Sequence, residues 1–163
     1  MKKQIEKACA GDPAAARLVL DRLAPEFELW ATKRMPREAA ATIAPAVRNG
    51  LQKALSNLKQ ATRRGEGAFL VEARAAILQE LAGSLGDMTQ SQLVRSVGQR
   101  PLESYERALN QLDATSREAL VLRVELGYAF DRIAAAIGVA SSDEARSIVS
   151  RSLLGMSELM EAP

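Results

Sequence analysis

Six polar residues near the C-terminal end of the chain have types and spacing suited to contacts with nucleic acid. They lie on the leading turns of the last predicted helix, and they are Ser142, Asp143, Arg146, Ser147, Ser150 and Arg151. Arginine donates hydrogen bonds to phosphates and to base edges, and serine is a short donor that suits either. The chemistry that these types indicate is recognition of a DNA duplex. The alternative is an ordinary exposed helix face, on which arginine pairs with Asp143 or Glu144.

The segment from Leu102 to Met160 must form the helices that position these side chains. Apolar residues recur along it at helical spacing, and Gly127 and Gly138 fall where that pattern lapses, as glycine does at helix ends. A short helix, a turn of about four residues containing glycine, and a longer helix form the outline of a helix-turn-helix. In such a unit the N-terminal turns of the last helix enter a major groove. A packed helical hairpin without a DNA contact fits the same spacing.

The expected caps and apolar residues give the register of this segment. Thr115 or Ser116 is expected to cap the second helix, and Ser141 or Ser142 the last one. The alanines at 134–136 are small enough to let the last two helices approach closely. The apolar residues that define the helical spacing are Leu120, Val121, Val124, Leu126, Phe130, Ile133, Ala134, Ile137, Ile148, Val149, Leu153 and Leu154.

Fixed positions between residues 106 and 159 follow the pattern ALxxLxxxxREAxxLRxxxGxxxxxIAxxxGxSxxxARxxxxRAL, except that Ser141 comes one residue later after Gly138. The matched residues are Ala108-Leu109, Leu112, Arg117-Glu118-Ala119, Leu122-Arg123, Gly127, Ile133-Ala134, Gly138, Ser141, Ala145-Arg146 and Arg151. With these matches, the segment resembles the C-terminal (fourth) domain of bacterial sigma factors of the extracytoplasmic-function type. The resemblance implies a domain that recognises the upstream promoter element through the six polar residues. It also implies contact with the flap of RNA polymerase.

The first part of the chain is predicted to be helical as well. A short amphipathic helix is expected over 2–10. Asp12 then has the type and place of an N-cap, with Pro13 at the first position of a helix over 13–34. Because proline removes a backbone donor and clashes with the preceding turn, a kink or break is expected before Pro25.

Two further helices are expected before residue 82, over 37–62 with an interruption at Pro45, and over 68–81. Steps of three and four between apolar residues predict one buried face on each. The apolar residues expected to form these faces, including that of the preceding helix, are Leu18, Leu20, Leu23, Phe27, Leu29, Trp30, Val47, Leu51, Leu55, Leu58, Phe69, Ala73, Ile77 and Leu81.

The N-terminal half resembles in outline the second domain of the same sigma factors. The passages that carry the resemblance are AGDPAAARLVLDRLAPEFELWATKRMP at 10–36 and GEGAFLVEARAAILQELAGSL at 65–85. The second passage occupies the place of the helix that opens promoter DNA. The resemblance implies that core RNA polymerase is bound by Val47, Arg48, Leu51, Gln52 and Lys53.

Composition predicts an all-α fold built as two small helical domains. Hydrophobic residues make up 47% of the chain, charged residues 26% and aromatic residues 4%, so the cores should consist of alanine, leucine, valine and isoleucine. The expected organisation is a helical domain over 1–82, a polar linker over 83–100 and the helix-turn-helix domain over 101–163. Charge is uneven between the halves: residues 1–99 have a balance of +5, and residues 100–163 a balance of −3.

The sequence offers little for catalysis or metal binding. It has no histidine and a single cysteine, Cys9, so neither an internal disulfide nor a zinc-finger spacing is expected. The carboxylate pairs Glu103 with Glu106 and Asp143 with Glu144 fit a solvated helix surface better than an acid–base pair. We expect no enzyme activity, cofactor or metal. Apolar stretches are too short for a membrane span, and no secretory leader is evident, so a cytoplasmic protein is expected.

Two hypotheses of different class follow. The first is a sigma-like transcription initiation factor with core RNA polymerase and promoter DNA as partners, and with an anti-sigma factor as a further possible partner. The second is a degenerate sigma-like protein-interaction module, a decoy, adaptor or regulator of a sigma and anti-sigma pair, without strand-opening activity. Its motivation is the acidic C-terminal half and the lack of any acid in residues 40–50, where the family carries an acidic stretch that binds polymerase.

Overall fold

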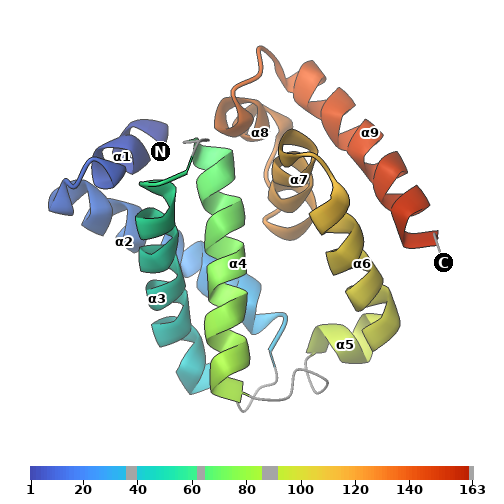
Figure 1. The fold of residues 1–163 in the computed structure, drawn as a ribbon, viewed down its shortest axis with the longest axis horizontal. Helices are drawn as coiled ribbons and strands as arrows, with labels where there is room; N and C mark the ends of the chain where they lie inside the picture. The colour runs from blue at the N-terminus through green and yellow to red at the C-terminus, as the bar shows by residue number, and fades with distance from the viewer. Residues whose placement is uncertain (36–39, 62–64, 86–91, 162–163) are drawn as a thin grey trace. The chain divides into compact units, whose positions relative to one another are not determined.

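The computed structural model describes residues 1–35, 40–61, 65–85 and 92–161 of the 163-residue chain. Within these ranges every regular element is a helix (Figure 1), which confirms the predicted all-α class. Contacts between residues cluster into two compact units, Met1–Ser96 and Val97–Pro163. Each unit is described by itself below.

Unit 1 is a bundle in which α3 packs against α2 and α4, and α1 lies on α2 (Figure 1). Its helices are α1 (Lys2–Cys9), α2 (Pro13–Thr32), α3 (Ala40–Leu58) and α4 (Glu66–Leu85). The start of α2 is as predicted: the Asp12 carboxylate accepts hydrogen bonds from the N–H groups of Ala14 and Ala15, at 2.9 and 3.1 Å, and Pro13 is the first helical residue.

The two internal prolines do not end their helices, so the break expected near Pro25 and the interruption expected at Pro45 are wrong. The kink expected as the alternative at Pro25 stays a prediction. Pro25 lies inside α2 and Pro45 inside α3. Both prolines are on the solvent side of their helices, as are Asp21 and Ala41, the residues four positions earlier. Water can therefore bond the carbonyl groups that lose an N–H partner at each proline. Burial of the opposite face of each helix then offsets the remaining cost.

The buried face of α2 differs from the predicted one. Leu18 and Leu29 are 48% and 61% exposed, although both belong to the predicted apolar stripe. The core positions are Ala15, Val19, Leu23, Ala24, Phe27, Trp30 and Ala31. Because α2 carries more apolar residues than one face can bury, the neighbouring helices decide which of them are covered.

The helices α3 and α4 bury the residues that the sequence predicts. Val47, Leu51, Leu55 and Leu58 are buried on α3, and Phe69, Ala73, Ile77 and Leu81 on α4. These two helices approach very closely at Gly50. A methyl group added at Gly50 would lie 2.7 Å from the backbone nitrogen and 2.8 Å from the Cα atom of Ile77. Only hydrogen in place of a side chain allows this packing distance.

Unit 2 is formed by four α-helices and a π-helical turn within its described residues. They are α6 (Gln99–Gln111), α7 (Ala114–Leu120), the turn Val121–Glu125, α8 (Phe130–Ile137) and α9 (Ser142–Glu161). The long helix α9 packs against α6, α7 and α8 (Figure 1). The guanidinium of Arg117 fastens the α6–α7 turn, because it donates hydrogen bonds to the carbonyls of Leu109, Asn110 and Leu112 at 2.8 to 3.0 Å.

Parts of the predicted linker are helical. Residues 83–85 continue α4, residues 92–97 form α5 (Gln92–Val97), and α6 already begins at Gln99. Residues 86–91 of the predicted linker lie outside the described residues. The polar composition and the glycines of residues 83–100 predicted a linker without helices, and this is wrong for the described residues of that range. Helices as short as α5 have too few residues to show a clear apolar period.

Gly50→Ala is expected to lower the free energy of unfolding of unit 1 by at least about 2 kcal/mol, because the added methyl group meets backbone that cannot move aside. The matched control is Gly155→Ala in α9, where the nearest atom to the new methyl is 3.9 Å away. That substitution should be neutral or stabilising through helix propensity. Trp30, the single tryptophan, is buried in unit 1, so its fluorescence in a denaturant titration reports this unit. Far-UV circular dichroism, which follows the helices of both units, is the readout for Gly155→Ala. Equal midpoints for wild type and Gly50→Ala would contradict the packing described.

Candidate nucleic-acid interface

The connection between α8 and α9 is a four-residue turn whose shape is set by Gly138. Gly138 has φ 79° and ψ 32°, the left-handed conformation that side chains other than glycine rarely adopt. Its N–H donates to the carbonyl of Ala134 at 2.9 Å, and the N–H of Val139 donates to the same carbonyl at 3.0 Å. The carbonyl of Ala134 thus accepts two hydrogen bonds where α8 ends, and the chain turns into α9 at once.

Reciprocal hydrogen bonds fix the start of α9. The hydroxyl of Ser141 accepts from the N–H of Glu144 at 3.1 Å, and the Glu144 carboxylate accepts from the N–H of Ala140 at 3.0 Å. Ser141, rather than Ser142, is thus the capping residue. For α7 the predicted caps are wrong: the carboxylate of Asp113 accepts from the N–H groups of Thr115 and Ser116.

Small and β-branched residues bring α8 and α9 together. Ile133, Ala134 and Ala136 of α8 are buried, as are Ala145 and Val149 of α9. The residues expected beneath the turn, Ile137, Val139 and Ile148, are half-buried. Leu153 and Leu154 follow the same helical spacing but are 48% and 68% exposed. The apolar pattern of α9 therefore marks its buried face only over its first half.

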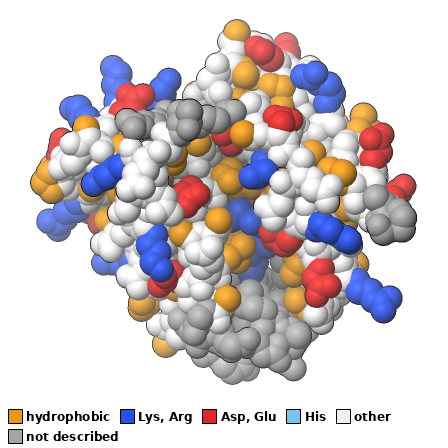
Figure 2. Space-filling model, viewed as in Figure 1, with side chains coloured by type: hydrophobic (Ala, Val, Ile, Leu, Met, Phe, Trp, Pro, Cys, Tyr) orange, Lys and Arg blue, Asp and Glu red, His pale blue; other side chains and the backbone are white. Residues whose placement is uncertain are grey.

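All six predicted DNA contacts are exposed on α9: Ser142, Asp143, Arg146, Ser147, Ser150 and Arg151. The hydroxyl of Ser147 donates to the backbone carbonyl of Asp143 at 2.9 Å, within the helix. Figure 2 shows acidic and basic side chains next to one another at the surface where α9 begins. The arrangement can present donors and acceptors together, as contacts with base edges require.

The two arginines of this set lie on different sides of α9. Five residues of α-helix turn through about 140°, so Arg146 and Arg151 cannot face the same surface. Arg146 lies over the ring of Phe130, with its Cζ atom 5.0 Å from the ring centroid. Arg151 instead lines a shallow cavity with Asp113 and Thr115 at the start of α7. Arg146 is therefore the arginine that belongs with the leading turns of α9.

Two residues outside the predicted set join this surface. Arg123, in the π-helical turn, has its Cζ atom 4.7 Å from the centroid of the same Phe130 ring. Phe130 itself is half-buried, although the apolar spacing placed it among the residues that define a core. Sequence spacing could not reveal the group, because Arg123, Phe130 and Arg146 come from three separate elements.

The surface is not strongly basic. Residues 97–163 contain seven arginines, no lysine and ten acidic residues, a balance of −3. Asp143 and Glu144 occupy the first turn of α9, where their charge stabilises the helix through its dipole. The same charges oppose phosphate groups, which weakens non-specific attraction to a nucleic acid at this surface.

The candidate polymerase-binding residues of α3 divide between core and surface. Val47 and Leu51 are fully buried in unit 1, so their side chains belong to its core, and polymerase binding by this set stays a prediction. Arg48, Gln52 and Lys53 are exposed. The spacing of apolar residues identifies one face of a helix. It does not show whether that face contacts a partner or the core of the protein itself.

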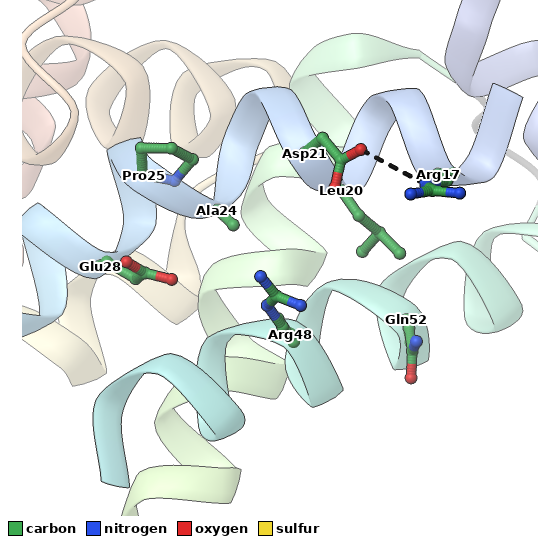
Figure 3. Close-up of a pocket in the computed structure, with 8 residues that line it drawn as sticks. All are labelled: Arg17, Leu20, Asp21, Ala24, Pro25, Glu28, Arg48 and Gln52. Atoms are coloured by element: carbon green, nitrogen blue, oxygen red, sulfur yellow. Dashed lines mark ion pairs between the residues drawn. The ribbon is translucent and has the colours of Figure 1, made fainter. Parts of the chain in front are cut away.

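Arg48 and Gln52 line a cavity of about 400 Å³ between α2 and α3. Figure 3 shows the Arg48 guanidinium pointing from α3 toward α2, between Ala24 and Leu20. On α2, Arg17 and Asp21 form an exposed ion pair at 3.7 Å. The cavity therefore offers both signs of charge to a partner, beside an apolar lining of Leu20, Ala24 and Pro25.

Lys53 is engaged within unit 1 by Glu80 of α4. The hydrogen bond from Lys53 lowers the pKa of the Glu80 carboxyl, and a second bond from the Asn49 amide, at 3.3 Å, adds to this effect. The ionised carboxylate thus links α3 to α4 at the surface. Lys53 would have to leave this partner before it could bind polymerase.

No family model matches the chain, and a search of curated proteins finds no match. The resemblance to sigma factors consequently rests on the residues quoted for it. None of the helices in the described ranges has the length and apolar character needed to span a membrane. Among the same residues, no group of three acidic or cysteine side chains is placed to hold a metal ion.

Glu80→Gln is expected to reduce stability at neutral pH and to have no effect in acid. The folded protein lowers the pKa of Glu80, so the stabilisation is present above the unfolded pKa and is lost as the pH falls through the folded one. Denaturant titrations of wild type and Glu80→Gln, followed by Trp30 fluorescence, should therefore converge as the pH is lowered.

The matched background for this comparison is Lys53→Gln, which removes the main cause of the pKa shift. In that background Glu80→Gln should change stability less, as expected for two groups that interact directly. A wild-type advantage that persisted at acid pH, or that was unaffected by Lys53→Gln, would contradict the assignment.

Proposed function

We propose that this protein is a sigma-factor-like transcription initiation factor, which binds core RNA polymerase and recognises promoter DNA through α9. In this proposal α8, the Gly138 turn and α9 act as a helix-turn-helix. The observation that carries it is the two-sided character of the first half of α9: Ala145 and Val149 are buried against the unit, while the six polar residues face solvent. A helix held in this way can enter a major groove with its leading turns.

The roles of individual side chains follow from their hydrogen-bonding groups. The guanidinium of Arg146 can donate two parallel hydrogen bonds to O6 and N7 of guanine, and the carboxylate of Asp143 can accept one from N4 of cytosine. Glu144 already accepts the N–H of Ala140, which assigns it to the helix start. Ser142 and Ser150 suit contacts with phosphates or bases.

The charge of unit 2 supports a role that depends on polymerase. Neutralisation of phosphates by lysine and arginine supplies most non-specific affinity for DNA, and unit 2 has the opposite balance of −3. Binding by this unit alone should therefore be weak, with polymerase and the more basic residues 1–96 adding affinity. The proposal implies a cytoplasmic protein that performs no reaction of its own, with an anti-sigma factor as a natural regulator.

The proposal does not include the opening of the DNA strands. The reasons for leaving it out also favour a second candidate function. Opening of a duplex needs exposed stacking faces and a basic channel, yet Phe69 and Arg74 of α4 are both buried. With Val47 and Leu51 also buried, the second candidate function is a sigma-like interaction module. Such a module would regulate a sigma and anti-sigma pair as a decoy or adaptor, without opening DNA.

Selection from a pool of duplexes with a randomised core, using the full chain with bacterial core RNA polymerase, should enrich one sequence. Arg146→Ala should then weaken binding of the enriched duplex by about tenfold or more and relax the preference at a single base pair. Electrophoretic mobility shifts over a series of salt concentrations measure both effects.

Arg107→Ala is the matched control, because Arg107 is an exposed arginine of the same unit on α6. It should leave the base preference unchanged. Enrichment of no sequence, together with recovery of an anti-sigma protein by the immobilised full chain, would favour the interaction module instead.

A further inference from the structure

Two arginines from different elements meet at one aromatic ring in unit 2. The Cζ atoms of Arg123 and Arg146 lie 4.7 and 5.0 Å from the centroid of the Phe130 ring. A cation at this distance over a ring is attracted by the negative charge of the π face. Phe130 is the first residue of α8, so its ring lies where the turn at 121–125, α8 and the second turn of α9 come together.

Arg123 is held by a backbone contact as well as by the ring. One of its N–H groups donates to the carbonyl of Tyr128 at 3.0 Å. The guanidinium has five N–H groups in a fixed plane, so one hydrogen bond sets its orientation and leaves donors that point elsewhere. Because the side chain is exposed, those donors can reach a ligand at the surface.

The ring replaces the carboxylate that usually accompanies a surface arginine. In the described part of the chain, no acidic side chain lies within 4.0 Å of the Arg123 or Arg146 nitrogens. Unit 1 shows the usual arrangement, with Arg17 paired to Asp21 and Lys53 to Glu80. In a unit with ten acids and seven arginines, two positive charges are thus kept together without being neutralised.

We propose that Arg123 binds a backbone phosphate of the duplex beside the base contact of Arg146, with Phe130 as the residue that positions both guanidiniums. The planar fork of arginine matches the oxygens of a phosphodiester, and the Phe130 ring holds both guanidiniums within 5.0 Å of its centroid. This inference rests on the proposed function and adds Arg123, which lies outside α8 and α9, to the interface.

The salt dependence of binding tests this site directly. For the full chain on the enriched duplex, Arg123→Ala should reduce the slope of log affinity against log salt by about 0.9, the value for one phosphate contact. Its affinity at low salt should fall about tenfold. Arg107→Ala, which removes the same charge from α6, should leave the slope unchanged.

Two variants of Phe130 separate positioning from charge. Phe130→Leu keeps most of the apolar volume but removes the ring, and should weaken binding by about threefold. Phe130→Tyr keeps the ring and should bind as wild type does. If Phe130→Leu fails to fold, the Arg123 comparison still decides, because Arg123 is exposed. A duplex with one neutral methylphosphonate at the contacted position should weaken wild type but not Arg123→Ala.

The possible failures are distinguishable. If selection enriches no duplex, the proposed function fails and this inference fails with it. If wild type binds an enriched duplex and Arg146→Ala relaxes its base preference, the proposed function stands. A slope for Arg123→Ala equal to that of wild type, or Phe130→Leu binding as tightly as Phe130→Tyr, would then overturn the phosphate site alone.

Discussion

The arrangement of unit 2 depends on the close approach of α8 to α9. This approach requires small side chains between the helices, which Ala134, Ala136 and Ala145 provide, and a chain reversal that the left-handed conformation of Gly138 allows. Once these conditions hold, the start of α9 has no freedom to turn its polar face inward. The exposure of Arg146 and its neighbours is thus a consequence of what is buried on the other side of the helix.

On α3 of unit 1, packing decides which residues are buried in the core and which remain at the surface. In unit 1 the lack of a side chain at Gly50 lets α3 pack closely against the backbone of Ile77 on α4. The apolar stripe of α3 that includes Val47 and Leu51 is buried in the core of the unit. The exposed neighbours on α3 then belong to the cavity beside α2 or to the link with Glu80. A partner of unit 1 would meet polar side chains held in place by an apolar layer beneath them.

The arginines of unit 2 lie in different environments, which the net charge of the unit does not reveal. Arg117 donates hydrogen bonds to three backbone carbonyls at the α6–α7 turn. Arg123 and Arg146 contact an aromatic ring. Among the residues that the structure describes, no carboxylate lies within ion-pair distance of either arginine. Arg151 lies on another side of α9. A balance of −3 can therefore coexist with a local concentration of positive charge, because the position of each charge matters more than the count.

The sequence by itself determined the helical class, the Asp12 cap, and the buried stripes of α3 and α4, because hydrogen bonding in a helix is local and the period of 3.6 residues is written into apolar spacing. It also placed six polar residues at exposed positions of the last helix. It did not determine that Leu18, Leu29, Leu153 and Leu154 are exposed, that α2 and α3 continue past their prolines, or that Phe130 gathers Arg123 and Arg146. Those outcomes depend on which neighbouring element covers each face, and only the tertiary structure brings residues distant in sequence into contact.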